Sequence, residues 1–311
     1  MVTAASTSAP ERAPSGQPSG HGGLSNLAQR ILFALGAIPV VLGAVWIGDW
    51  ALASVLAIAS ALAAWEFYRI AEQLGTRPMA RAGIAFAALL PLAIHARYLG
   101  LPVDAVVSLP FAAVVVLALF SAVIFARGVN GRPLASVSLT VFGVVYTGAM
   151  LSFGYALRYH QYAVGRTAGT SLLMFALVLV WISDTAAYVV GRALGKRKLI
   201  PAVSPGKTVA GAVGALITCA VAGWALVRFV LVPYAQLGLR PIHAVLFGIA
   251  VSVATQLGDL AESLIKREAG VKDSSHIIPG HGGVLDRIDG MLFALPVAYW
   301  LLTAWLVPVP R

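Results

Sequence analysis

Residues 243–265 read HAVLFGIAVSVATQLGDLAESLI, an apolar run that ends in two acids, Asp259 and Glu262. Such a run is long enough to cross a hydrocarbon core, which takes about 20 apolar residues in helical form. Comparable runs occur at 31–48, 50–67, 82–96, 105–126, 135–157, 170–190, 208–232, 243–265 and 287–307. Backbone amides in lipid must be satisfied within their own segment, and the alternation of a barrel strand is absent. We therefore predict an all-α integral membrane protein, a polytopic bundle of about nine transmembrane helices.

The composition supports this class. Hydrophobic residues make up 59% of the 311-residue chain and charged residues 11%, whereas a soluble domain carries roughly 25% charged residues. If the N-terminus is cytoplasmic, sixteen of the 22 bases fall in cytoplasmic segments and the other six fall outside, as the positive-inside rule requires. We expect a multi-pass protein of the plasma membrane with a polar cavity that faces the cytoplasm. A homodimer is a further expectation, and no nucleic-acid partner is expected without a basic soluble domain.

The chain divides into three predicted parts. Residues 1–25 are rich in Ala, Ser, Pro and Gly and predict a disordered cytoplasmic tail. Residues 26–165 form the N-terminal membrane helices, and residues 166–311 form a C-terminal catalytic membrane region. Cys219 is the only cysteine, so an internal disulfide is excluded.

Residues 259–290 hold six of the twelve acids and four of the 22 bases. Charge at bilayer depth costs at least roughly 2.5–3.5 kcal/mol per residue, so this concentration predicts a functional site. Four polar residues here follow the spacing i, i+3, i+4, i+7 and form one stripe of a helix. They are Asp259, Glu262, Ser263 and Lys266. The stripe must face protein or a water-filled cavity, and internal pairing of its acids with the lysine is the structural alternative.

A glycine-rich loop follows this helix. The chain leaves the helix at Gly270 and runs to the sequence GHGG at 280–283, ahead of a helix that begins near Val284. Asp286 and Asp289, one turn apart in that helix, carry the oxygens that Mg²⁺ prefers together with substrate phosphates. An ordinary glycine-rich turn with capping acids is the alternative.

The two histidines of this region, His276 and His281, do not predict zinc. The chain places no cysteine and no third histidine beside them, and structural zinc sites use such ligand sets. We expect His281, between glycines, to donate to a phosphate, and His276 to be exposed.

Two acids lie in other predicted spans. Asp184, with Ser183 and Thr185, lies deep in the span 170–190, where either a site or a polar contact between helices explains it. Glu66 lies near the end of the second span, and we expect it to reach the interface by snorkelling.

The segment 200–208, IPAVSPGKT, is a second polar loop on the same side. It is not a P-loop, because Pro201 stands where the first glycine is needed and no strand precedes it. Ser204, Lys207 and Thr208 beside a helix N-terminus predict a phosphate cradle. A basic loop facing anionic lipid is the alternative.

Together these motifs resemble the phosphatidate cytidylyltransferases, also called CDP-diacylglycerol synthases. The resemblance rests on SLIKREAGVKDSSHIIPGHGGVLDRID at 263–289, on SPGKT at 204–208 and on SDT at 183–185. It implies condensation of CTP with phosphatidate to CDP-diacylglycerol and pyrophosphate. It also implies a Mg²⁺ and a companion monovalent cation such as K⁺, held by Asp259 and Asp286. Val209 and Ala210 depart from the family pattern, which leaves any acidic role at position 210 in doubt.

The resemblance and the charges together assign candidate roles. The candidate catalytic residues are Asp259, Asp286, Lys266 and Ser263. The candidate substrate-binding residues are Ser204, Lys207, Thr208, Arg267, Lys272, Asp273, His281, Gly282, Gly283, Arg287, Asp289 and Asp184. Because the phosphate of phosphatidate is already ionised, we expect direct in-line displacement without a covalent intermediate.

Three other functions are alternatives to this one. A transporter of anionic lipid should show a symmetrical second half, and residues 1–150 hold no counterpart of the charged stretch. A CDP-alcohol phosphotransferase needs a pattern that the sequence after Asp289-Gly290 lacks. A related nucleotidyltransferase or kinase acting on a polyprenol or another phospholipid remains the nearest alternative.

Overall fold

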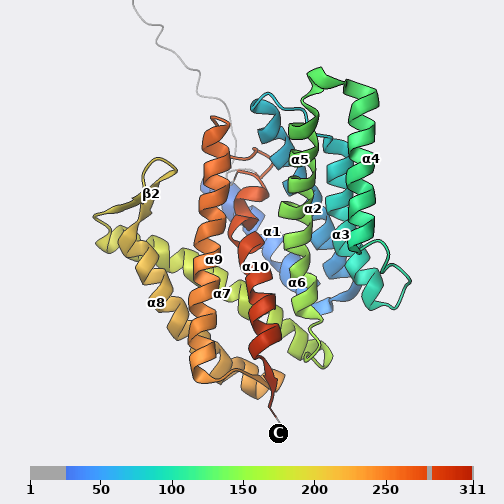
Figure 1. Ribbon diagram of the computed structural model, residues 1–311. Coiled ribbons are helices and arrows are strands. Elements are labelled where there is room, and N and C mark those ends of the chain that lie inside the picture. Colours follow the sequence, from blue (N-terminus) through green and yellow to red (C-terminus); the bar gives the residue numbers. More distant parts are fainter. Residues whose placement is uncertain (1–25, 279–281, 310–311) are drawn as a thin grey trace, which may run out of the picture.

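The computed structural model describes residues 26–278 and 282–309 (Figure 1). The predicted tail, 1–25, therefore lies outside the described residues. The helices are α1 (Asn26–Ile47), α2 (Asp49–Gln73), α3 (Ala80–Tyr98), α4 (Leu109–Arg127), α5 (Pro133–Gly143), α6 (Met150–Arg158), α7 (Gly165–Leu194), α8 (Val209–Leu226), α9 (Pro241–Glu268) and α10 (Leu285–Trp305). The 3-10 turn η1 (Val129–Gly131) precedes α5, the π-helix η2 (Val144–Ala149) joins α5 to α6, and the π-helix η3 (Val227–Ala235) extends α8.

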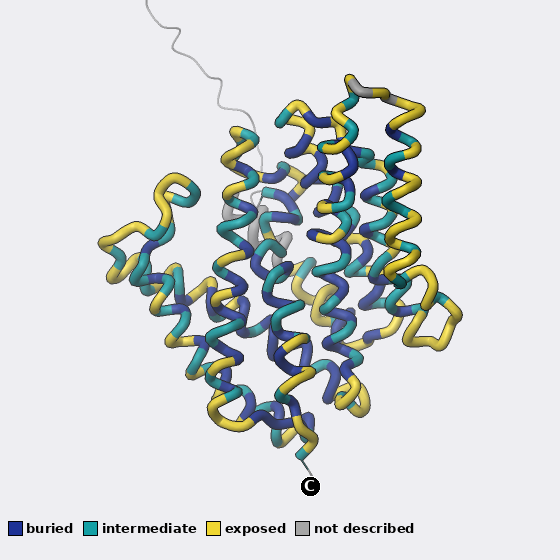
Figure 2. Tube along the Cα trace, viewed as in Figure 1, coloured by how far each residue is buried: buried dark blue, intermediate teal, exposed yellow. Residues whose placement is uncertain are grey.

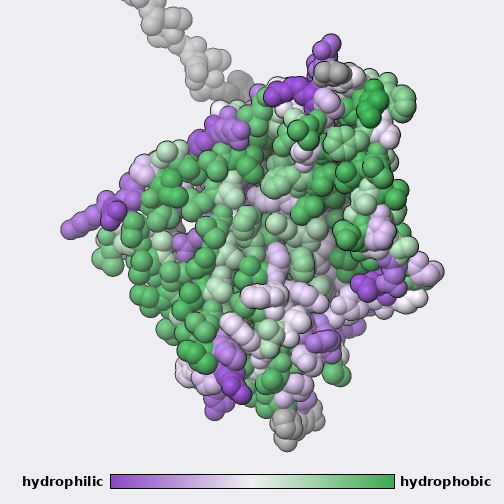
Figure 3. Space-filling view, viewed as in Figure 1, coloured by the Kyte–Doolittle hydropathy of each residue, from purple (hydrophilic) through white to green (hydrophobic). Residues whose placement is uncertain are grey.

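The all-α, polytopic membrane architecture is confirmed. In the described part of the chain, eight helical segments are long and apolar enough to cross a membrane, with α5 to α6 and α8 to η3 each counted as one. The first predicted span falls on α1, where only the shorter apolar stretch Leu35–Ile47 is recognised. Hydrophobic residues cover most of the flank of the bundle, and hydrophilic residues gather mainly toward its ends and the outer hairpin (Figure 3).

The helices α9 and α10 lie at the centre, with α7 and α8 on one side and α2 to α5 on the other (Figure 1). Buried residues follow the middle of the bundle, whereas α4 at its edge is largely exposed (Figure 2). The break between α1 and α2 is a single residue, Gly48, with φ of +74°. Glycine adopts this conformation without the strain of a side chain, and the next amide, Asp49 N, donates to the Tyr159 hydroxyl at 2.6 Å.

Small residues let the C-terminal helices approach closely. A Cβ at Gly248 of α9 would collide with the carbonyl oxygen of Cys219 in α8. A Cβ at Gly258 of α9 would likewise collide with the carbonyl oxygen of Asp289 in α10. Without a hydrophobic drive between helices in lipid, such close backbone packing supplies the association energy. The contact at Gly258, next to Asp259, brings the α9 backbone close to that of α10 at Asp289.

The predicted polar loop at 200–208 is instead an antiparallel hairpin. Its strands are β1 (Lys198–Ile200) and β2 (Ser204–Thr208), paired at Lys198 with Thr208 and at Ile200 with Ser204. It projects beside α8 (Figure 1). A second short pair, β3 (Leu237–Gly238) with β4 (Val307–Pro308), follows the ends of η3 and α10.

Candidate active site

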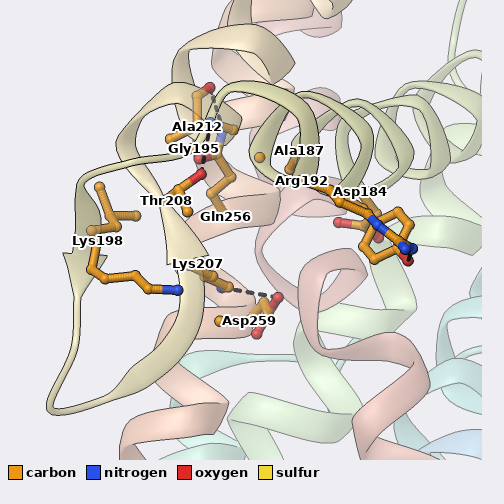
Figure 4. A pocket seen from close by; sticks show the side chains of 15 residues that line it. Asp184, Ala187, Arg192, Gly195, Lys198, Lys207, Thr208, Ala212, Gln256 and Asp259 are labelled. Atoms are coloured by element: carbon orange, nitrogen blue, oxygen red, sulfur yellow. Dashed lines mark hydrogen bonds and ion pairs between the residues drawn. The ribbon is translucent and has the colours of Figure 1, made fainter.

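A polar cavity of about 650 Å³ opens among α7, the β1–β2 hairpin, α8 and α9 (Figure 4). Its lining includes four of the predicted site residues, Asp184, Lys207, Thr208 and Asp259, which come from α7, β2 and α9. The side chains that can bind a ligand are those of Asp184, Tyr188, Arg192, Lys198, Lys207, Thr208, Gln256 and Asp259. The structure thus brings the 204–208 segment against Asp259, at the start of the charged stretch.

The closest contact across the cavity joins the hairpin to α9. Lys207 Nζ lies 2.9 Å from Asp259 Oδ2 (Figure 4), while Asp259 Oδ1 accepts a hydrogen bond from Ser263 Oγ at 3.3 Å. The Lys207 ammonium is itself buried and makes no aligned hydrogen bond among the described residues. Apart from the ion pair with Asp259, the Lys207 protons therefore remain available to an anionic ligand in the cavity.

The N-terminus of α8 forms another wall. Thr208 caps the helix, because its Oγ1 accepts a hydrogen bond from Gly211 N at 3.1 Å. Thr208, Gly211 and Ala212 all line the cavity. A helix N-terminus presents free amide donors and a partial positive charge, which favour phosphate. The helix N-terminus predicted beside Lys207 is thus present, and phosphate binding there stays a prediction.

The α7 wall contains the predicted Asp184 together with two residues, Tyr188 and Arg192, that were not among the predicted site residues. Asp184, Tyr188 and Arg192 follow one another at i, i+4 and i+8 and all line the cavity, and an Arg192 nitrogen donates to the Tyr188 hydroxyl at 3.0 Å. Ser183, by contrast, is buried and shares a hydrogen bond with Ser252 Oγ of α9 at 2.8 Å. Helical spacing from Asp184 was the signal that could have found Tyr188 and Arg192.

The predicted stripe of α9 divides between two environments. Asp259 lines the cavity and accepts a hydrogen bond from Ser263, whereas Glu262 and Lys266 are buried against α10. Lys266 Nζ lies 2.6 Å from Glu262 Oε2 and 2.6 Å from Asp286 Oδ1. The internal pairing that the sequence left as an alternative therefore occurs at this end of the stripe and links α9 to α10.

The Asp286 carboxylate binds the glycine-rich loop in addition to Lys266. Its Oδ2 accepts from Ser274 N at 3.0 Å, from Ser274 Oγ at 2.9 Å and from Gly283 N at 2.8 Å. Gly282 has φ of +82°, and a Cβ there would lie 2.6 Å from Asp286 Oδ2. Glycine is required at this position by both the backbone conformation and the space.

Glu66 corrects the sequence prediction. We expected it to snorkel to the interface, but its residue is completely buried. Its Oε1 accepts from Ser275 Oγ at 2.6 Å and from Val284 N at 2.9 Å. Its Oε2 accepts from Leu285 N at 2.7 Å and lies 3.0 Å from Ser274 Oγ, whose single proton it shares with Asp286 Oδ2. An acid of α2 therefore positions the loop and the first turn of α10, because four donors compensate the cost of burying its charge.

Gly283 is the second glycine that this arrangement demands. A Cβ there would lie 2.5 Å from each carboxylate oxygen of Glu66. The glycine-rich sequence thus allows two carboxylates, Glu66 and Asp286, to approach the same stretch of backbone. No sequence signal links Glu66 to this loop, because more than 200 residues separate them.

The other predicted site residues lie around the polar cavity and around the buried carboxylates Glu66 and Asp286. Arg267 is exposed and ties the hairpin to the end of α9, since its Nε donates to Val203 O at 3.4 Å. Asp289 is half-buried and accepts from Gly290 N at 2.7 Å. Ser204 is the first residue of β2, and Arg287 lines a second cavity. The side chains of Lys272, Asp273 and His276 are exposed. His281 lies outside the described residues.

The comparisons with known proteins agree with this arrangement. The model of the cytidylyltransferase family matches residues 28–305. The chain belongs to this family. The phosphatidate cytidylyltransferase of Haemophilus influenzae is 47% identical over 141 residues, which are 45% of this chain and 48% of that protein. The phosphatidate cytidylyltransferase of Bacillus subtilis is 47% identical over 134 residues, which are 43% of this chain and 48% of that protein. The phosphatidate cytidylyltransferase of Staphylococcus haemolyticus is 40% identical over 162 residues, which are 52% of this chain and 57% of that protein.

The chain spans about half the length of the curated relatives that it matches. The resemblance read from the sequence is confirmed at the level of the cytidylyltransferase family. Because the family match begins at residue 28, the N-terminal helices that carry Glu66 belong to it as well.

The cavity fits a divalent cation only in part. Asp259 faces the cavity with a side chain that is 39% exposed, and Lys207 is its only basic partner in the described chain. Asp286 has its two oxygens taken by Lys266, Ser274 and Gly283. Asp259 therefore fits a Mg²⁺ that takes its other ligands from phosphates and water, whereas Asp286 could join only if a present donor left.

The buried charge cluster of Glu262, Lys266 and Asp286 gives a stability prediction. Lys266→Met strands Glu262 and Asp286 without their cation, so we expect a loss of about 3–5 kcal/mol in the free energy of unfolding. The unfolding temperature in detergent measures this. Adding Glu262→Gln removes one stranded charge and should recover part of the loss. An unfolding temperature equal to that of the parent would show that the cluster does not hold α9 to α10.

Proposed function

We propose that the chain catalyses the reaction of CTP with phosphatidate to give CDP-diacylglycerol and pyrophosphate. The observation that carries the proposal is the cavity in which Lys207 and the α8 N-terminus converge on Asp259. Such a set of donors suits a polyphosphate. Support also comes from the relatives, which are named phosphatidate cytidylyltransferase.

The placement in the membrane follows from the charges. We propose that the β1–β2 hairpin, with Lys196, Arg197 and Lys198 before and within β1, faces the cytoplasm, where CTP is present and positive loops are favoured. The N-terminus would then be cytoplasmic and the membrane the plasma membrane. A homodimer and the lack of a nucleic-acid partner stay predictions.

The chemistry needs positioning more than acid–base catalysis. The second ionisation of a phosphate monoester lies near pH 6, so the phosphatidate phosphate is a nucleophile at neutral pH. One of its oxygens attacks the α-phosphorus of CTP. A new P–O bond forms there, the bond between the α-phosphorus and the α,β-bridging oxygen breaks, and pyrophosphate leaves with the electron pair.

The residues of the cavity would hold these anions together. Lys207, Lys198 and Arg192 balance the triphosphate charge, and the amides at the start of α8 bind its oxygens. Asp259 would hold a Mg²⁺, which when bound supplies further charge neutralisation on the phosphates. Asp286 as a second ligand, and a companion K⁺, remain proposals. Holding the two reactants in line accounts for much of the rate in phosphoryl transfer.

The test uses the full-length protein purified in detergent. With CTP labelled in its α-phosphate, phosphatidate and Mg²⁺, we expect label to enter a lipid-soluble product, and EDTA to abolish this. A polyprenyl phosphate in place of phosphatidate tests the nearest alternative. Label that enters lipid only with the polyprenyl phosphate, or with neither acceptor, would contradict the proposal.

A further inference from the structure

A second cavity, of about 390 Å³, lies between the N-terminal helices and the catalytic helices. Its walls come from α1, α2, α6, α7 and α10, and nearly every lining side chain is apolar. Its wall on α1 includes Ile38, Val41 and Leu42, all of which are exposed in the protein. In a membrane this exposed wall faces lipid, so the acyl groove, as we call this cavity, is open to the bilayer.

One charged residue, Arg287, lines the acyl groove. It is exposed, and its guanidinium has no hydrogen bond or ion pair among the described residues. Asp184, on the wall of the polar cavity, is close enough for the two charges to interact. An unpaired cation at the edge of an apolar groove is costly at bilayer depth unless it meets an anion. Arg287 lines the acyl groove and Asp184 lines the polar cavity, so the two cavities approach each other near these two side chains.

The same helix face leads from one cavity to the other. Leu173, Leu177 and Trp181 of α7 line the acyl groove at intervals of four residues. Asp184 and Tyr188, further along α7, line the polar cavity. Because residues four apart lie on one face of a helix, an elongated molecule lying along α7 would contact apolar side chains first and polar ones at its end.

We propose that the acyl groove holds an acyl chain of the lipid substrate, with Arg287 binding the lipid phosphate and directing it to the polar cavity. This inference rests on the proposed function and names the place of its lipid. Three features fit a phospholipid chain: the apolar walls, the exposure to the bilayer and the single cation at one end. A lipid with one acyl tail in the groove keeps its phosphate within the protein and its other tail in the membrane. The helices α1 and α2 thereby acquire a role in substrate binding.

The experiment places a larger side chain on the wall of the acyl groove so that it occupies the space of an acyl chain. Gly154 of α6 lines it, and a Cβ there would lie 3.6 Å from side-chain atoms of Leu56 and Leu295, which is ordinary contact. Gly154→Leu therefore places its remaining carbons inside the groove. The matched control is Gly43→Leu in α1, where nothing lies within 4 Å of an added Cβ and which is not part of the lining.

We expect Gly154→Leu to raise KM for a long-chain phosphatidate about tenfold, the equivalent of roughly two buried methylenes. KM for a dihexanoyl phosphatidate, whose chains are too short to fill the groove, and KM for CTP should stay unchanged. Gly43→Leu should match the parent with both lipids. Arg287→Gln should raise KM for long and short lipids alike, because both carry the phosphate, and Arg287→Lys should recover part of the affinity.

A second measurement does not depend on turnover. A phosphatidate with a photoreactive group in its acyl chain should label peptides of α1, α7 or α10 in the parent protein, and less so in Gly154→Leu. Labelling confined to other helices, or equal KM changes for both chain lengths in Gly154→Leu, would overturn the acyl groove. If the parent protein forms no CDP-diacylglycerol, the proposed function fails, and the pattern of labelling still decides whether the groove binds lipid.

Discussion

Glu66→Gln should lower kcat by at least about 100-fold, because a displacement of the catalytic geometry by about 1 Å has effects of this size. The Glu66 carboxylate accepts four hydrogen bonds, two on each oxygen, and each oxygen receives one backbone amide. A glutamine must turn its NH₂ group toward one of these two amides. Whichever way it turns, a buried donor faces another donor, which costs about 1–3 kcal/mol.

The Glu66→Gln substitution acts on the glycine-rich loop and the start of α10 rather than on the lining of the polar cavity. Val284 and Leu285 begin α10, and Ser274 is shared between Glu66 and Asp286. Loss of the Glu66 contacts would let this segment move and would displace Asp286 and Arg287. Activity and the unfolding temperature together measure the effect.

The control is Glu72→Gln on the same helix. Glu72 is exposed, and its side chain makes no hydrogen bond or ion pair with the described residues. It should keep both parental activity and parental stability. Parental activity in Glu66→Gln would show that the loop does not need this carboxylate.

Asp259→Asn should lower kcat/KM by about 100–1000-fold, the range seen when one preorganised electrostatic contact to the reacting group is lost. The substitution removes the partner of Lys207 and the carboxylate best placed for Mg²⁺. Because the side chain is 39% exposed, the loss of the pair should cost little stability. The expected result is therefore an inactive protein with an unfolding temperature near that of the parent.

Asp104→Asn is the matched control for Asp259→Asn. It breaks another exposed ion pair, Arg97 with Asp104 at 2.7 Å, which lies outside both cavities. It should leave activity unchanged. If Asp259→Asn retained parental kcat/KM, the reaction would have to take place elsewhere in the protein.

The helices were predictable because the hydrophobic effect and backbone hydrogen bonding in lipid leave few alternatives to apolar runs of this length. Their ends were less predictable, since local caps decide them. The span predicted from residue 105 begins as a helix at Leu109, where Ser108 Oγ accepts from Phe111 N. The π-helices η2 and η3 leave no such pattern in the sequence.

The site was predictable where its residues are close in sequence. Helical spacing placed Asp259 near Ser263, and the apolar run that begins at residue 208 placed a helix N-terminus next to Lys207. The sequence could not show that Asp259 lines the cavity while Glu262 and Lys266 are buried, because this depends on which face of α9 meets α10. Glu66 was misjudged because interfacial position and burial against a distant loop give the same local sequence pattern.

The most direct test of cytidylyl transfer in this cavity compares two labelled forms of CTP. The protein is incubated with phosphatidate and CTP labelled in either the α-phosphate or the γ-phosphate, and lipid is extracted. Transfer of the cytidylyl group predicts label in the lipid from the α-phosphate only, and label in water-soluble pyrophosphate from the γ-phosphate. Lipid labelled from the γ-phosphate would identify a kinase and would contradict this account.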